Sequence, residues 1–158
     1  MTEKKRRQAE LLSRGLFVVY MLVLIYFLFF AEGMGRTEAS AAYRYNLTLF
    51  KEISRFWRKR AVVGYAASFI NIAGNVLCFV PFGLFLPGVS RRFFRNGFIV
   101  ILSGLCLSLV VETIQLLTRI GSFDVDDLFL NTIGVVTGYL AGRILVRLGR
   151  HYNEKKTI

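Results

Sequence analysis

The chain has 158 residues, of which 54% are hydrophobic and 20% are charged. A soluble domain devotes about a quarter of its residues to charge, so this composition favours a membrane protein. The low content of Pro and Gly excludes collagenous and low-complexity disordered classes. The two cysteines lie in separate apolar stretches and there is one histidine, so neither a secreted disulfide framework nor a zinc site of paired histidines fits.

Four stretches approach the roughly 20 apolar residues that cross a bilayer as a helix. They predict an all-α, multi-pass membrane protein with a basic N-terminus at residues 1–15, a single membrane domain at 16–146 and a basic tail at 147–158. The expected spans cover residues 16–31, 61–86, 97–117 and 128–146. Basic residues precede the first stretch, as in a signal peptide, but no convincing small-residue cleavage site follows it, so we interpret it as a retained anchor.

The formal charge of +11 is distributed in a way that predicts the orientation of these spans. Four spans put both termini on one side, and the positive-inside rule favours the cytoplasm for them. The discordant segment is the first loop, where basic and aromatic residues alternate between Phe50 and Arg60. That pattern predicts an amphipathic helix in the headgroup plane, with membrane lipids as its partners, and the segment is too short for a nucleic-acid interface.

Each of the last three expected spans carries one polar stripe, because its polar residues recur every three or four positions. The stripes are Ser68, Asn71 and Asn75 in the second span, Ser108, Glu112, Gln115 and Arg119 in the third, and Asp127 and Asn131 at the start of the fourth. The helical rise places Glu112 and Asn131 roughly 7 to 9 Å outward from their span centres. We therefore expect a polar pocket in the outer half of the membrane, although such stripes also serve to join helices by hydrogen bonds.

Glu112 is the strongest candidate for a functional role, because an ionised carboxylate in lipid needs a cationic partner. Arg119, two turns along the same stripe, is the candidate for that partner. Glu112 and Asp127 are the candidate catalytic bases, if chemistry takes place, because burial raises the pKa of a carboxyl group. The expected binding residues are Arg44, Asn71, Asn75, Gln115, Arg119 and Asn131.

Three aspartates, Asp124, Asp126 and Asp127, lie just before the fourth span. Capping of a helix start explains at least one of them, because aspartate binds exposed amides at the positive end of the helix dipole. Their mutual repulsion would also be relieved by Arg119 or by a bound Mg²⁺ or Ca²⁺. We assign no metal site, leave this alternative open, and identify no cofactor.

Two further patterns concern helix packing. Gly134, Gly138 and Gly142 recur every four residues in the fourth span, which predicts close approach of another helix. Pro81 removes one backbone hydrogen bond within the second span and predicts a kink there.

Several motifs appear in a characteristic order between residues 44 and 142. They are Arg44-Tyr45-Asn46-Leu47 with Phe50, Asn71 to Asn75 followed by Phe79-Val80-Pro81-Phe82-Gly83, Glu112-Thr113-Ile114-Gln115, and Arg119 with Asp124 to Asp127 and Asn131 to Gly134. Together they resemble the VanZ-like family, which commonly has Pro where this chain has Leu49. The resemblance implies an integral protein of the bacterial plasma membrane. It also implies a link to glycopeptide antibiotics, because the family's namesake is linked to teicoplanin resistance.

The resulting hypothesis is a protein that binds an anionic or lipid-linked cell-envelope precursor in an outward-facing pocket and contributes to glycopeptide resistance, with catalytic processing left open. One alternative is a small carrier or proton-coupled transporter that uses Glu112 as a relay. Four spans are few for transport, so this alternative requires a homo-oligomer. The other alternative is a non-enzymatic membrane assembly partner, whose stripes hold helices together.

Overall fold

The computed structural model describes residues 3–27, 43–63, 65–89, 93, 96–119 and 121–155, together with most of their side chains. Its elements are mainly helical and are joined by two short strands. They are α1 (Glu3–Tyr26), β1 (Tyr45–Asn46), α2 (Lys51–Val63), α3 (Tyr65–Val89), α5 (Gly97–Thr118), β2 (Phe123–Asp124) and α6 (Val125–Lys155).

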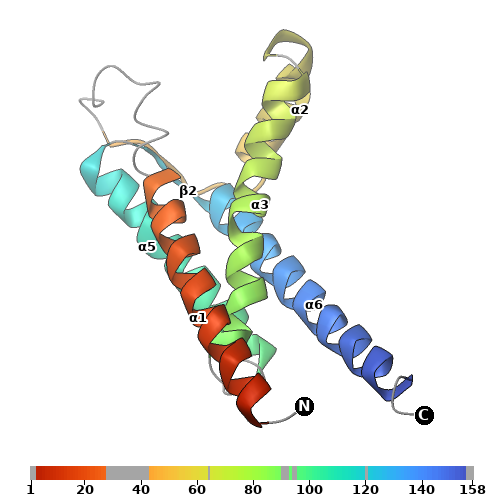
Figure 1. Ribbon diagram of the computed structural model, residues 1–158. Coiled ribbons are helices and arrows are strands. Elements are labelled where there is room, and N and C mark those ends of the chain that lie inside the picture. Colours follow the sequence, from red (N-terminus) through yellow and green to blue (C-terminus); the bar gives the residue numbers. More distant parts are fainter. Residues whose placement is uncertain are drawn as a thin grey trace.

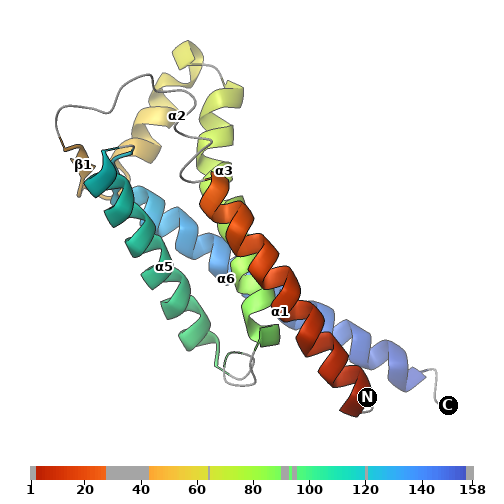
Figure 2. The ribbon, with the colours of Figure 1, turned by 60° about the vertical axis from the view of Figure 1, so that its left-hand side comes forward.

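The helices form an elongated bundle in which α1 and α6 both pack against α3, and α5 packs against α6 (Figure 1). The two chain ends lie at one end of the bundle, while β1, β2 and α2 lie toward the other (Figures 1 and 2). In both views α2 and the first turns of α3 form a hairpin that extends beyond the ends of α1 and α5. The fold therefore separates a helical body from a smaller cap of strands and α2.

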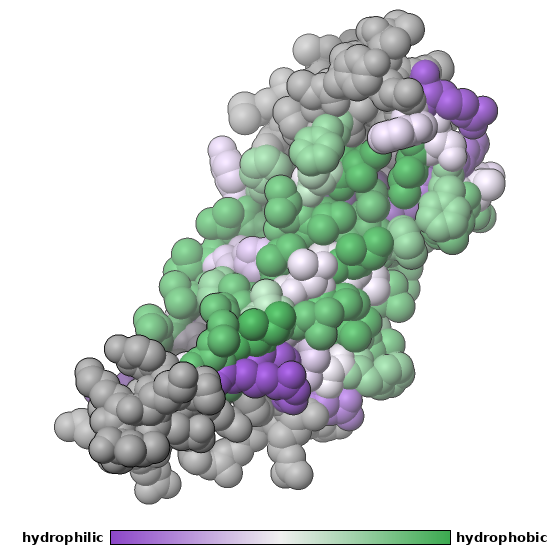
Figure 3. Space-filling view, turned by 90° about the vertical axis from the view of Figure 1, so that its right-hand side faces the viewer, coloured by the Kyte–Doolittle hydropathy of each residue, from purple (hydrophilic) through white to green (hydrophobic). Residues whose placement is uncertain are grey.

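Three helices are long and apolar enough to cross a membrane, with apolar windows at Ile72–Val89, Gly97–Thr118 and Val125–Gly149. A face of the molecule shows mostly hydrophobic side chains across its middle and hydrophilic ones toward its ends, as expected of a membrane protein (Figure 3). Residues 28–31 of the first expected span lie outside the described residues. These three windows correspond to the second, third and fourth expected spans. A further crossing by the first expected span, and the headgroup placement of α2, stay predictions.

The boundaries of two expected spans differ from the helices observed. The second expected span, 61–86, is divided between the end of the basic helix α2 and the apolar helix α3. The last helix begins at Val125 and continues through most of the expected tail to Lys155. This helix begins three residues before the expected span because Asp124 caps it. The helix α3 stays helical through Pro81 and Pro87.

Local caps define both ends of α5. The Oδ1 atom of Asn96 accepts hydrogen bonds from the N–H groups of Phe98 and Ile99, at 3.1 and 3.4 Å. At the other end Arg119 has a left-handed backbone with φ of 60°, and its N–H donates to the Leu116 carbonyl at 3.1 Å. These bonds satisfy backbone groups that a helix leaves unpaired at its ends.

The predicted close approach along the glycines of α6 is confirmed. A Cβ atom at Gly134 would overlap the carbonyl of Val76, and one at Gly138 would overlap the carbonyl of Val80. On α3, a Cβ at Gly83 would overlap the Val135 carbonyl in the same way. The two backbones therefore touch, and the contact admits no side chain larger than hydrogen at these three positions.

The apolar core beside this contact joins α1, α3, α5 and α6. Its buried members are Leu24, Phe79, Phe82, Leu86, Val100 and Val135. From α1, Phe17 packs on Phe82 with ring centroids 5.6 Å apart, and the Tyr20 hydroxyl donates to the Cys78 carbonyl at 2.8 Å. These contacts hold α1 against α3.

We expect Gly138→Ala to lower the free energy of unfolding by about 1 to 3 kcal/mol, because the added methyl group forces α3 and α6 apart. Gly149→Ala is the matched control on the same helix, since a Cβ at Gly149 meets nothing within 4 Å. The control should be neutral or slightly stabilising, because alanine favours helix more than glycine. Thermal unfolding in the same detergent compares the variants, and equal midpoints would refute the close contact.

Candidate functional site

Buried polar side chains gather where the cap joins the bundle. They are Asn46, Ser108, Glu112, Gln115, Asp124, Asp126 and Asn131. The strands β1 and β2 meet here as a parallel pair, with Asn46 opposite Asp124. The Phe123 N–H also donates to the Arg44 carbonyl at 3.1 Å. This pairing joins the segment before α2 to the loop between α5 and α6. Strands of two residues are too short for periodicity to predict them from the sequence.

Asp126 caps a helix other than its own. It is 1% exposed, and its carboxylate accepts the N–H groups of Phe50, Glu52 at 2.8 Å and Ile53 at 3.1 Å. These amides lie at the start of α2, where backbone donors lack partners within the helix and the helix dipole favours negative charge. A buried carboxylate of α6 thus holds the first turn of α2 against the bundle.

The backbone at Phe50 adopts φ of 64°, in the left-handed region that non-glycine residues seldom occupy. The Asp126 carboxylate accepts its N–H, and its ring meets Phe129 edge to face with centroids 5.3 Å apart. Two contacts to α6 therefore stabilise the turn that leads into α2.

Asp124 connects Glu112, Asn46 and the start of α6. Its N–H donates to Glu112 Oε2 at 2.9 Å, while its Oδ1 accepts from Asn46 Nδ2 at 3.0 Å and from the Asp126 N–H at 2.8 Å. The last bond makes Asp124 the cap of α6, which confirms that capping explains at least one of the aspartates. Burial raises the pKa of the Asp124 carboxyl group, and its hydrogen bonds from Asp126 and Asn46 partly offset that effect.

The structure brings members of the different polar stripes together. Asn75 Nδ2 donates to Asp127 Oδ1 between α3 and α6, and Asn131 Nδ2 donates to Ser108 Oγ at 2.8 Å between α6 and α5. Gln115 is buried, and its backbone carbonyl accepts the Gly121 N–H at 3.3 Å. The side chain of Asn71 lies outside the described part of the chain, as does that of Ser68.

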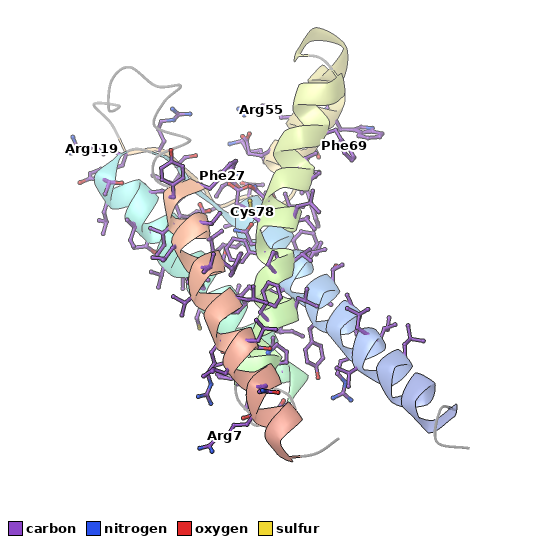
Figure 4. All side chains as sticks on the ribbon, viewed as in Figure 1. Arg7, Phe27, Arg55, Phe69, Cys78 and Arg119 are labelled. Carbon is purple, nitrogen blue, oxygen red and sulfur yellow. The ribbon has the colours of Figure 1, made fainter. Side chains whose placement is uncertain are left out.

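Arg44 and Arg119 lie at the surface of the cap, apart from the buried cluster. The guanidinium carbon of Arg119 is 4.6 Å from the ring centroid of Tyr43, the residue before Arg44. Both arginine side chains are exposed, and Arg119 lies at the end of α5 (Figure 4). The structure thus places Arg119 over an aromatic ring at the surface and the Glu112 carboxylate on the buried Asp124 amide.

The aspartate side chains point to different hydrogen-bond partners. Among the residues with described placement, no group of three or more His, Cys, Asp or Glu side chains could hold a metal ion. The reason is that Asp126 faces the α2 amides, Asp124 faces Asn46, and Asp127 faces Asn75. Oxygen atoms that accept N–H bonds in three directions do not enclose a common cation.

The VanZ/LLP1 family model matches residues 17–146, which include every member of this hydrogen-bonded cluster. The chain belongs to the VanZ/LLP1 family. It is also similar to Protein VanZ of Enterococcus faecium, with 31% identity over 149 residues that cover 93% of this chain and 81% of that protein. No solved structure gives a significant match. The family match agrees with the motifs found in the sequence. One of those motifs contains Asn46, which was not predicted from the sequence as a site residue.

We expect Asp126→Ala to destabilise the first turn of α2, with a loss of about 2 kcal/mol, because three buried or half-buried N–H groups lose their acceptor. Hydrogen exchange at Phe50, Glu52 and Ile53 measures the effect directly. Asp126→Asn keeps one acceptor oxygen and should show a smaller increase in exchange. Unchanged exchange in the alanine variant would exclude the proposed cap.

Asp124 should make stability depend on pH in a defined direction. Its folded pKa lies above the ordinary value of 3.8, so the folded state binds the proton more tightly than the unfolded state. Its contribution to stability is therefore greatest below pH 3.8 and is lost as the pH rises through the raised pKa. Unfolding of the wild type and of Asp124→Asn, measured across this pH range, should differ increasingly in favour of Asn. A difference of opposite slope would contradict the raised pKa.

Proposed function

We propose that this VanZ-family protein binds an anionic or lipid-linked envelope precursor at the surface formed by Arg44 and Arg119. In this proposal it is a four-span protein of the bacterial plasma membrane. Both termini lie in the cytoplasm, and the end that carries β1 and β2 faces outward. The observation that carries the proposal is the separation of charges at this end: Glu112, Asp124 and Asp126 are buried while the two arginines are exposed.

Arg44 and Arg119 come from distant segments that meet at the cap. The Arg44 carbonyl accepts the Phe123 N–H, which fixes the backbone at the start of β1. The Arg119 guanidinium lies over Tyr43, the immediate neighbour of Arg44. Both attachments reduce the freedom that a ligand would otherwise have to restrict on binding.

The ligand class follows from the chemistry of the guanidinium group. Arginine presents planar, bidentate donors that match phosphate and carboxylate oxygens. The diphosphate of a lipid-linked precursor has this chemistry at a membrane surface, and its polyprenyl chain would stay in the adjoining bilayer. Gln115 and Asn131 lie in the buried cluster, and the half-buried Asn75 donates to Asp127. We therefore assign recognition of the charged head to the two arginines.

The proposal is of binding rather than of catalysis. Glu112 accepts the Asp124 N–H, and Asp127 accepts from Asn75, so both candidate bases have structural partners. A general base must instead reach a proton of the substrate. A contribution to glycopeptide resistance would then arise through the bound precursor, in keeping with the similarity to Protein VanZ.

The non-enzymatic assembly partner is the second candidate. It is supported by the bonds between stripes, Asn75 to Asp127 and Ser108 to Asn131, which join three helices as interhelical contacts do. In that case the arginines would have no ligand, and the cap would serve as a contact for another membrane protein.

We expect Arg119→Gln and Arg44→Gln each to weaken binding of polyprenyl diphosphate by about tenfold, the loss typical of one charge-assisted hydrogen bond. Binding to the full chain in lipid nanodiscs is the measurement. Arg147→Gln, an exposed arginine near the opposite end of α6, is the matched control and should leave the affinity unchanged. Equal affinities of all variants would exclude the binding surface.

The same variants test the link to antibiotics. Cells that express Arg119→Gln should tolerate less teicoplanin than cells that express Arg147→Gln at equal membrane levels. Binding loss without a change in tolerance would separate the ligand site from glycopeptide resistance.

A further inference from the structure

The exposed face of α2 forms a second basic and aromatic surface, which we call the α2 surface. It includes a shallow hollow that is lined by Ile53, Ser54, Trp57 and Arg58. Trp57, the one tryptophan of the chain, is 66% exposed. A large aromatic side chain this exposed on a helix rich in arginine and lysine is typical of a surface that meets a partner.

The charged residues of α2 are mostly positive. Its basic residues are Lys51, Arg55, Arg58, Lys59 and Arg60, against the single acidic residue Glu52. Glu52 forms an ion pair with Arg55, so it offsets the charge of a neighbour on the same helix. Asp126, the nearest acidic side chain from α6, is buried beneath the first turn. The α2 surface therefore presents net positive charge and suits an anionic partner.

The Asp126 carboxylate limits where another anion can bind on this helix. Asp126 accepts the N–H groups of Glu52 and Ile53, so the helix start is already occupied by a carboxylate. The side chains must then supply the contacts. Arg58 Nε donates to the Ser54 carbonyl at 3.3 Å, which holds the guanidinium group beside the hollow and next to Trp57.

The arrangement matches the boundary between bilayer headgroups and acyl chains. Tryptophan and tyrosine are enriched at this level, and lysine and arginine beside them attract anionic lipids. Tyr45 and Phe50, near the start of α2, are exposed aromatic residues as well. Figure 4 shows Arg55 and Phe69 projecting on opposite sides of the α2–α3 hairpin.

We propose that the α2 surface docks on anionic phospholipid headgroups, with Trp57 at the headgroup boundary and Lys51 and Arg58 on lipid phosphates. The occupant is the surrounding bilayer and differs from the precursor bound at Arg44 and Arg119. The inference rests on the proposed placement of the β1 and α2 end at the membrane surface. It assigns the excess positive charge of the first loop to lipid selection.

Trp57 provides the measurement, because no other tryptophan contributes to the fluorescence of the chain. The full chain is reconstituted in bilayers that contain equal mole fractions of phosphatidylcholine and phosphatidylglycerol, with one lipid brominated on its acyl chains. We expect brominated phosphatidylglycerol to occupy the site near Trp57 about fivefold more than brominated phosphatidylcholine, the factor that corresponds to one basic residue at a membrane surface.

Arg58→Gln should reduce this lipid preference toward equality, and Arg147→Gln should retain it. Arg58 bonds within its own helix, so the variant is expected to fold, and circular dichroism of the reconstituted protein checks this. The preference should also fall with increasing salt, because exposed charges are screened.

Three results would overturn the proposal. Strong quenching of Trp57 without preference for phosphatidylglycerol would leave α2 at the interface but remove the anionic selection. Absence of quenching by either lipid, with emission typical of water, would place α2 away from the bilayer and favour a protein or nucleic-acid partner. A preference that survives in Arg58→Gln would assign the selection to another site. Precursor binding at Arg44 and Arg119 has its own assay, so failure of lipid selection and failure of precursor binding are distinguished.

Discussion

The hydrogen bonds that the first N–H groups of α2 donate to the Asp126 carboxylate are the interaction on which the position of α2 depends. A buried carboxylate is costly unless donors surround it, and unpaired amides at a helix start are costly in the same way. Each group here removes the other's penalty. Because the bonds run from α6 to α2, they also set the position of the segment that carries Arg44, so the exposed site depends on a buried charge.

The buried cluster depends in turn on close packing of the bundle below it. Contact between the α3 and α6 backbones at Gly134 and Gly138 brings Asn75 within reach of Asp127. A larger residue at either glycine would separate the helices and lengthen this bond. The glycines thus contribute to the geometry of the polar end as well as to the apolar core.

The distribution of charge gives this end of the molecule its chemical character. The acidic residues Glu112, Asp124 and Asp126 are buried at this end, where the Glu112 and Asp126 carboxylates accept backbone N–H groups. The surface that remains is basic and aromatic. That separation supports the two anionic partners that we propose, a precursor at Arg44 and Arg119 and phospholipid at α2.

Sequence alone determined the family, the helical class and the glycine contact, because long apolar stretches, ordered motifs and four-residue spacing are local properties of the chain. It also identified Asn75, Asp127, Ser108 and Asn131 as members of polar stripes. Tertiary structure decided which of them meet, that Asp126 caps α2, and that Glu112 binds the Asp124 backbone while Arg119 covers Tyr43. Those contacts join residues up to 76 positions apart, and periodicity carries no information about which distant backbone amide a carboxylate will reach.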